Sequence, residues 1–203
     1  MTCRSKVGGV VIYEDTRQQK GKHDIKHAWW ASHGVTVAVR KLDFGDYMAD
    51  RSDISVDTKR SVDEIAQNIN GKNHERFKNE CLRAAAANCR LVVLVENRDG
   101  IEDYNGLRNW MNTHCRMCGV RSRVHCIPFD GKRCERHGTR KPIQGPRLAT
   151  AMQTMSLRYG VDFMFCKPSE SARIICELLG VGYERDAGGG AQAALDGLQD
   201  APD

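Results

Sequence analysis

An alternating stretch that ends in a lysine and runs directly into a helix start constrains this chain most strongly. Residues 54–59 read Ile-Ser-Val-Asp-Thr-Lys, and this alternation of apolar and polar side chains predicts a β-strand. Ser61 and Glu64 have the spacing of a capping box, so a helix is expected to begin just after the strand. Because side chains alternate across a strand, Asp57 and Lys59 are expected to share one face.

A second carboxylate lies close by in the sequence. Asp46 follows Gly45 at the end of an apolar-polar run, eleven residues before Asp57. Two carboxylates and a lysine on one patch suit metal-assisted hydrolysis of a phosphodiester, because a hard divalent cation prefers oxygen ligands and an ammonium group can orient the attacking water. Taken alone, the same charges could also be the solvated face of a strand.

The rest of the chain alternates between strand and helix patterns. Strands are expected at 8–13, 35–41, 46–50, 91–96 and 161–165, and helices at 24–33, 61–70, 74–88, 104–112, 146–159 and 169–179. In the first helix, Ile25, Ala28 and Trp29 share one side. This order predicts an α/β fold.

The motif region resembles the signature of the XPF-type structure-specific endonucleases, a branch of the PD-(D/E)XK superfamily. That signature is a Gly-Asp, a spacer, Glu-Arg-Lys, three residues and an Asp. Gly45-Asp46, Asp57-Thr58-Lys59 and Asp63 stand at those offsets. Residues 10–17 resemble the opening strand of the family, residues 91–96 its next core strand, and Arg76 the arginine that follows the motif helix.

The resemblance implies a restriction-endonuclease-like fold, a mixed central sheet flanked by helices, in a metal-dependent endonuclease that cuts branched or flapped DNA in repair or recombination. Asp46 and Asp57 would hold Mg²⁺ or Mn²⁺, joined by the backbone carbonyl of Thr58, and Asp15 would add a further oxygen. Lys59 would orient the attacking water. The products would carry 5′-phosphate and 3′-hydroxyl ends.

Other roles also follow from the resemblance. Arg17 and Arg76 are candidates for gripping the DNA strand that is cut, and Asp63 is expected to orient Lys59 or an arginine. These nuclease domains commonly pair, so a homodimer or pairing with another subunit is expected.

Asp57 replaces the glutamate of the signature, a mild change because the superfamily pattern allows either acid, and two further positions depart more strongly. Thr58 stands where the family usually has arginine, and Gln18 stands where it usually has glutamate. Two other interpretations remain open, the first because of these departures and the second because of an insert described below. One is a catalytically weak DNA-binding subunit, and the other is a zinc-dependent interaction module.

The zinc interpretation rests on a Cys/His-rich basic insert at residues 113–145. Its candidate zinc ligands have zinc-ribbon spacing. They form two pairs, the two ligands of each pair are separated by two residues, and fifteen residues lie between the pairs. They are Cys115, Cys118, Cys134 and His137. Residues 114–147 also contain nine Lys or Arg against two Asp or Glu, so the insert could contact DNA phosphates. The candidate contacts are Arg121, Arg123, Lys132 and Arg133. A cysteine-rich basic loop without metal is the alternative.

Charge and composition fit a nucleic-acid partner. The net charge is +5, and residues 181–203 carry −4 from five acids and one arginine, which leaves +9 on residues 1–180. We expect a stand-alone nuclease domain over residues 1–180 and a flexible acidic tail over 181–203. No apolar run is long enough for a membrane span and no signal peptide is recognisable, so a cytoplasmic protein is expected, or a nuclear one in a eukaryote. Four further cysteines are expected in the core: Cys81, Cys89, Cys166 and Cys176.

Overall fold

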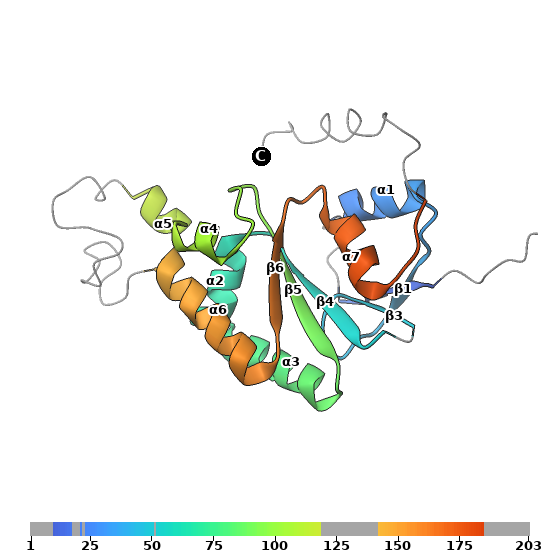
Figure 1. The fold of residues 1–203 in the computed structure, drawn as a ribbon, viewed down its shortest axis with the longest axis horizontal. Coiled ribbons are helices and arrows are strands. Elements are labelled where there is room, and N and C mark those ends of the chain that lie inside the picture. Colours follow the sequence, from blue (N-terminus) through green and yellow to red (C-terminus); the bar gives the residue numbers. More distant parts are fainter. Residues whose placement is uncertain (1–9, 18–20, 22, 51, 119–141, 185–203) are drawn as a thin grey trace, which may run out of the picture.

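A six-stranded mixed sheet forms the centre of the molecule (Figure 1). The computed structural model describes residues 10–17, 21, 23–50, 52–118 and 142–184. The strand order is β2-β1-β3-β4-β5-β6, in which β1 and β4 each pair antiparallel with β3 and all other neighbours are parallel. The strands are β1 (Ile12–Asp15), β2 (Val37–Arg40), β3 (Tyr47–Ala49), β4 (Ile54–Lys59), β5 (Arg90–Glu96) and β6 (Asp162–Cys166).

Helices cover both faces of the sheet and enclose two apolar cores. The first core lies under α2 (Val62–Asn70), α3 (His74–Ala86), α4 (Tyr104–Arg108) and α6 (Gly145–Tyr159). The second core lies under α1 (Asp24–Ser32) and α7 (Ser171–Leu179). One further short helix, α5 (Thr113–Arg116), begins the insert. Strand β5 is buried on both faces, and its apolar run suits that position. This architecture confirms the predicted restriction-endonuclease-like α/β fold.

The antiparallel turns around β3 bring the motif strands together. The amide of Asp15 donates to the carbonyl of Asp46 at 2.9 Å, and the amide of Asp46 donates to the carbonyl of Val56 at 2.8 Å. Three segments that are distant in the sequence therefore meet at one end of the sheet. Asp15 ends β1, Asp46 directly precedes β3, and Asp57 lies two residues before the end of β4.

The predicted strand at 54–59 and the helix that follows it are both present, with one difference at the cap. Ser61 Oγ accepts a hydrogen bond from the Glu64 amide at 3.1 Å, as a capping box requires. The Glu64 carboxylate, however, accepts from the amide of Arg60 at 2.9 Å rather than from that of Ser61. The helix start is therefore held one residue further back than the pattern predicted.

The predicted helix at 104–112 was wrong in its length. It ends at Arg108, and a separate helix begins at Thr113. The intervening chain packs against the start of α6, where the Gly145 amide donates to the Trp110 carbonyl at 2.9 Å. A Cβ at Gly145 would lie 2.1 Å from the carbonyl oxygen of Leu107, so this approach requires glycine. A tertiary contact across about forty residues thus ends the helix.

Helix α1 buries a different side from the one that its apolar residues suggested. Ile25 is exposed and Trp29 is half-buried, whereas Lys26 and Trp30 are buried. Trp30 packs in the second core and donates its indole N–H to the Ala172 carbonyl at 3.1 Å. Lys26 can be buried because its ammonium pairs with Glu96 on β5.

Three of the four predicted core cysteines, Cys81, Cys166 and Cys176, are buried, and the fourth, Cys89, is half-buried. Of the expected tail, residues 181–184 are described; Val181 is buried in the second core and Tyr183 packs edge-on against Trp29. Within the described part of the chain, no helix has both the length and the apolar character needed to cross a bilayer.

Candidate active site

Strand β4 carries an acid and a lysine side by side, as the alternation predicted. Lys59 Nζ lies 2.5 Å from Asp57 Oδ2, and both side chains are at least nine-tenths buried. The ammonium also lies 5.7 Å from the centre of the Phe77 ring, close enough for a cation–π contact. The pair is therefore held in place from two sides at the end of the strand.

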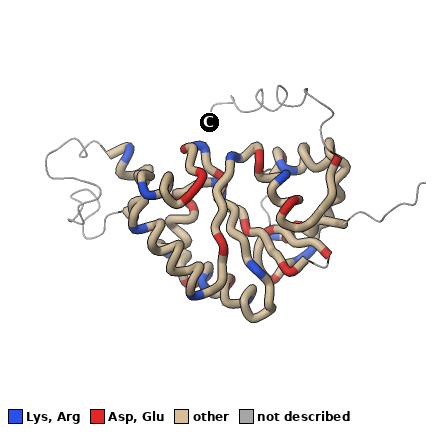
Figure 2. Tube along the Cα trace, viewed as in Figure 1, with Lys and Arg blue, Asp and Glu red and all other residues tan. Residues whose placement is uncertain are grey.

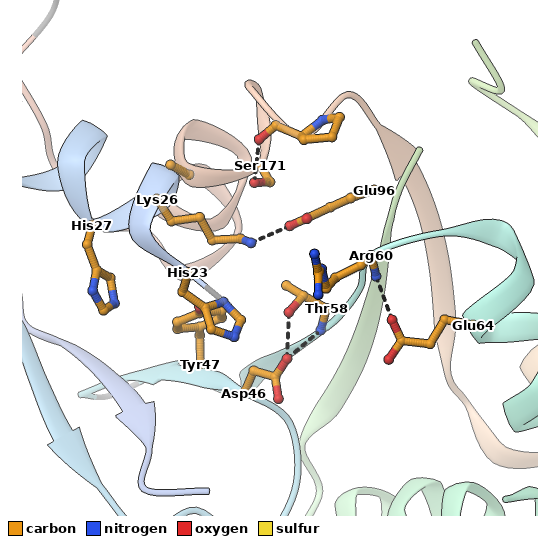
Figure 3. Close-up of polar contacts among 12 residues, drawn as sticks. His23, Lys26, His27, Asp46, Tyr47, Thr58, Arg60, Glu64, Glu96 and Ser171 are labelled. Carbon is orange, nitrogen blue, oxygen red and sulfur yellow. Dashed lines mark hydrogen bonds and ion pairs between the residues drawn. The ribbon is translucent and has the colours of Figure 1, made fainter. Parts of the chain in front are cut away.

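Asp46 is held by Thr58, one of the positions at which this chain departs from the family pattern. Its Oδ2 accepts hydrogen bonds from the Thr58 hydroxyl at 2.6 Å and from the Thr58 amide at 2.9 Å (Figure 3). The preceding Gly45 has a φ of 68°, and a Cβ there would lie 2.1 Å from Ser55 Oγ. Position 45 therefore requires glycine, because its backbone is left-handed and a side chain there would collide with Ser55.

Asp15 lies at the end of β1, next to the Asp46 backbone. Its Oδ2 is 2.5 Å from Arg17 Nε, and its Oδ1 accepts from the Leu42 amide at 3.0 Å. Arg17 also donates to the Leu42 carbonyl at 2.7 Å, while more than half of its side chain stays exposed. Asp15 is therefore buried and held, and Arg17 lies at the rim.

These groups line a single cavity of about 290 Å³ at this end of the sheet. It contains every described residue predicted for the catalytic and metal site. The lining residues are Asp15, Arg17, Gly45, Asp46, Asp57, Thr58, Lys59, Glu64, Arg76, Glu80 and Arg83. Glu80 and Arg83 were not predicted, although their spacing from Arg76 on one helix, four and seven residues, could have indicated them.

Burial dominates the electrostatics of the pair on β4. Burial raises the pKa of Asp57 to about 7; Lys59 acts against this shift, and the charges of Asp46 and Glu80 add to it. Burial would lower the pKa of Lys59, but the nearby carboxylates outweigh it and raise that pKa above its usual value. Lys59 is therefore a permanent cation, and Asp57 is an acid whose charge depends on a positive partner.

Asp63 does not have the predicted role. Its Oδ1 accepts from the Thr113 amide at 3.1 Å and its Oδ2 accepts from the Thr113 hydroxyl, so it holds the first turn of α5. Its described contacts include neither Lys59 nor an arginine. Asp63 lies in the first turn of α2, and its side chain points away from the cavity towards the base of the insert.

A second polar cluster lies on the opposite face of the sheet, under α1 (Figure 3). Lys26 Nζ is 2.5 Å from Glu96 Oε1, and both side chains are buried. The Tyr47 hydroxyl contacts His23 Nδ1 at 2.6 Å and Glu14 at 3.2 Å. Burial and the neighbouring acids raise the pKa of Tyr47 far above its usual value, so it stays protonated. Sequence patterns gave no sign of this cluster.

Part of the predicted site falls outside the described residues. This applies to the four basic positions of the insert and to two of the candidate zinc ligands: Arg121, Arg123, Lys132, Arg133, Cys134 and His137. The other two ligands, Cys115 and Cys118, are buried at the start of the insert. Gln18 is likewise not described.

The donor chemistry of the cavity fits a hard divalent cation. Asp46, Asp57 and Asp15 supply carboxylate oxygens, and the buried Asp57 Oδ2 lies against the Lys59 ammonium at 2.5 Å. In the described part of the chain, no three His, Cys, Asp or Glu side chains lie close enough together to enclose a metal ion. Mg²⁺ often uses only one or two carboxylates and completes its shell with water and phosphate oxygens.

Comparison with known families decides the identity of the fold. The family model described as ERCC4 domain matches residues 15–178, most of the chain. The chain belongs to the ERCC4-domain family. It is therefore an XPF-type nuclease domain that acts on DNA, and the matched range contains Asp15, Asp46, Asp57 and Lys59. No curated protein matches the chain. In this ERCC4 domain, basic and acidic positions are interspersed along the trace (Figure 2).

Proposed function

We propose that this ERCC4 domain is a metal-dependent endonuclease that cuts DNA at branched or flapped structures during repair or recombination. The single observation that carries the proposal is the buried Asp57–Lys59 pair beside Asp46, in a cavity rimmed by Arg17 and Arg76. A purely structural ion pair would not need further acids and arginines around it.

Each residue has a distinct part in the proposed reaction. Asp46 and Asp57, with the Thr58 carbonyl, would hold Mg²⁺ or Mn²⁺, and Asp15 would support them from β1. The bound cation would supply Lewis-acid activation of the phosphate and of the attacking water. Lys59 orients that water and offsets the charge that develops on the phosphate. Arg17 and Arg76 bind the phosphates on either side, and cleavage leaves 5′-phosphate and 3′-hydroxyl ends.

Thr58 is compatible with this activity. Its hydroxyl and amide hold Asp46, which a backbone amide alone would hold less firmly. This contact supports an active enzyme over the catalytically weak DNA-binding subunit. Pairing with a second copy or another subunit remains part of the proposal.

The test is incubation with Mg²⁺ and a panel of branched and linear DNAs, beside the Asp57→Ala protein. The wild-type protein is expected to nick the branched DNAs, and the variant to bind the same DNAs without cutting them. Equal cleavage by both proteins would contradict the mechanism. DNA binding without cleavage by the wild-type protein would favour the non-catalytic subunit.

We also propose that the insert binds zinc through Cys115, Cys118, Cys134 and His137. The described end of the insert supports this: Gln144 Nε2 donates to Cys115 Sγ at 3.0 Å, and the Cys118 amide donates to the Cys115 carbonyl at 3.3 Å. Outer hydrogen bonds of this kind orient metal ligands. Metal analysis of the purified protein should find about one zinc, and replacement of Cys115 and Cys118 should remove it. No zinc in the wild-type protein would refute the site.

A further inference from the structure

Helix α3 grips the backbone next to Asp46 at two points. The Gly45 amide donates to Glu80 Oε1 at 2.9 Å, and Arg83 Nε donates to the Asp43 carbonyl at 3.1 Å. Asp43 and Gly45 belong to the segment that leads into Asp46. A donor and an acceptor of that segment are therefore both satisfied by side chains of one helix.

Helix α3 is itself packed in the first core. Phe77, Cys81 and Ala84 are each about 1% exposed and pack in the first core. Glu80 and Arg83 lie one position before Cys81 and Ala84, so they occupy the adjacent face of the same turns. Side chains on a helix that is packed in a core on one face can hold a loop more closely than loop contacts could.

The held segment is also supported by Phe44, which is buried in the first core and whose carbonyl accepts from Ser55 Oγ at 3.2 Å, but the Gly45 amide is held by α3. Gly45 has a left-handed backbone, and within the described residues its amide hydrogen bond goes to a side chain rather than to a strand. Asp46 itself is fixed by Thr58 and by the backbone of Val56. The position of the Asp46 carboxylate thus depends on β4 from one direction and on α3 from the other.

We propose that Glu80 and Arg83 are positioning residues that clamp residues 43–46 to α3 and so set the place of the Asp46 carboxylate in the cavity. The inference rests on the proposed function for its catalytic consequence. Glu80 acts through the hydrogen bond that its Oε1 accepts, so glutamine can replace it and alanine cannot.

The test compares Glu80→Ala, Glu80→Gln and a control, Glu75→Ala, which removes an exposed acid from the same helix. The first measurement is exchange of the Gly45 amide hydrogen by NMR in metal-free protein, which requires no cleavage. Because a hydrogen bond to a charged group corresponds to about a tenfold change or more in an equilibrium constant, Glu80→Ala should speed exchange by about that factor. Glu80→Gln and Glu75→Ala should stay within about threefold of wild type.

The second measurement is the Mg²⁺ concentration for half-maximal cleavage of a flap DNA. Glu80→Ala should raise it by about tenfold, with a smaller change for Glu80→Gln. Unchanged Gly45 exchange in Glu80→Ala, or equal losses of cleavage in the alanine and glutamine variants, would overturn the clamp. If Glu80→Ala does not fold, Arg83→Met replaces it, with faster exchange over residues 43–46 expected and unchanged exchange refuting the clamp. If the wild-type protein cuts nothing while Gly45 exchange responds as expected, the proposed function fails and the clamp stands.

Discussion

The hydroxyl and the amide of Thr58 both donate to one oxygen of Asp46, Oδ2, at 2.6 and 2.9 Å. Both groups come from a single residue on β4, and the accepting carboxylate comes from the loop before β3. Thr58 lies between Asp57 and Lys59, so the same strand presents an acid and a lysine on one face and holds Asp46 from the other.

Thr58→Val should weaken this contact without changing the shape of the side chain. The variant keeps the amide donor and loses the hydroxyl, and a hydrogen bond to a charged group contributes about 1.5–3 kcal/mol. We expect the free energy of unfolding, measured by urea denaturation, to decrease by an amount in that range. Cleavage should fall by about tenfold. Thr58→Ser keeps the hydroxyl and should behave like wild type; a Thr58→Val protein as active as wild type would show that the hydroxyl is dispensable.

Metal binding should depend on pH through Asp57. Its pKa in the folded protein is about 7, above the ordinary value of 3.8, so the folded state holds the proton more tightly than the unfolded state. The stability that this group contributes to the metal-free protein is therefore fully present at low pH and is lost as pH rises from about 4 through about 7. A divalent cation binds the deprotonated carboxylate, so protons compete with it.

We accordingly expect Mg²⁺ to stabilise the protein more at pH 8 than at pH 6. At a hundred times its dissociation constant, a bound ligand adds about 2.7 kcal/mol to the free energy of unfolding. Thermal denaturation with Mg²⁺ or EDTA at both pH values measures the effect. Asp57→Asn should lose both the gain and its pH dependence, whereas an equal gain at the two pH values in wild type would place the cation elsewhere.

Asp63 should matter for the insert more than for the chemistry. Asp63→Ala removes both acceptors for Thr113, and we expect faster hydrogen exchange over residues 112–118 and a loss of about 1–2 kcal/mol in stability. Cleavage should change by less than about tenfold, because Asp63 does not contact Lys59. Asp63→Asn retains an acceptor for the Thr113 amide and serves as the milder control. A loss of cleavage as large as that of Lys59→Ala would restore the role that the motif first suggested.

The buried Lys26–Glu96 pair should be costly to break from one side. Lys26→Met leaves Glu96 as a buried charge without its partner, so the free energy of unfolding should fall by about 3–5 kcal/mol. The double variant Lys26→Met/Glu96→Gln should lose less than the sum of the single changes. The exposed pair Lys78–Glu75 is the matched control, worth less than about 1 kcal/mol. A Lys26→Met protein as stable as wild type would contradict the burial of the pair.

The local order of strand and helix followed from sequence patterns because those patterns are set by near neighbours. Strand 54–59, the Ser61 cap and the shared face of Asp57 and Lys59 depend on side-chain alternation and on contacts within four residues. Asp46 was identified from its place in the sequence and the family signature added Asp15, and the cavity contains both.

Contacts between distant segments decided the rest. The contact with Gly145 ends the helix that the apolar pattern extended to residue 112. The ion pair with Glu96 allows Lys26 to be buried. Glu80 and Arg83 enter the site because α3 packs beside the Asp46 loop, and Asp63 leaves it because Thr113 lies within reach. The sequence by itself determined the type of fold and the acids and lysine of the site, since alternation, capping and motif spacing are local. Only the tertiary structure decided which charges are buried, paired or turned towards the cavity, since burial and pairing depend on which segments the sheet brings together.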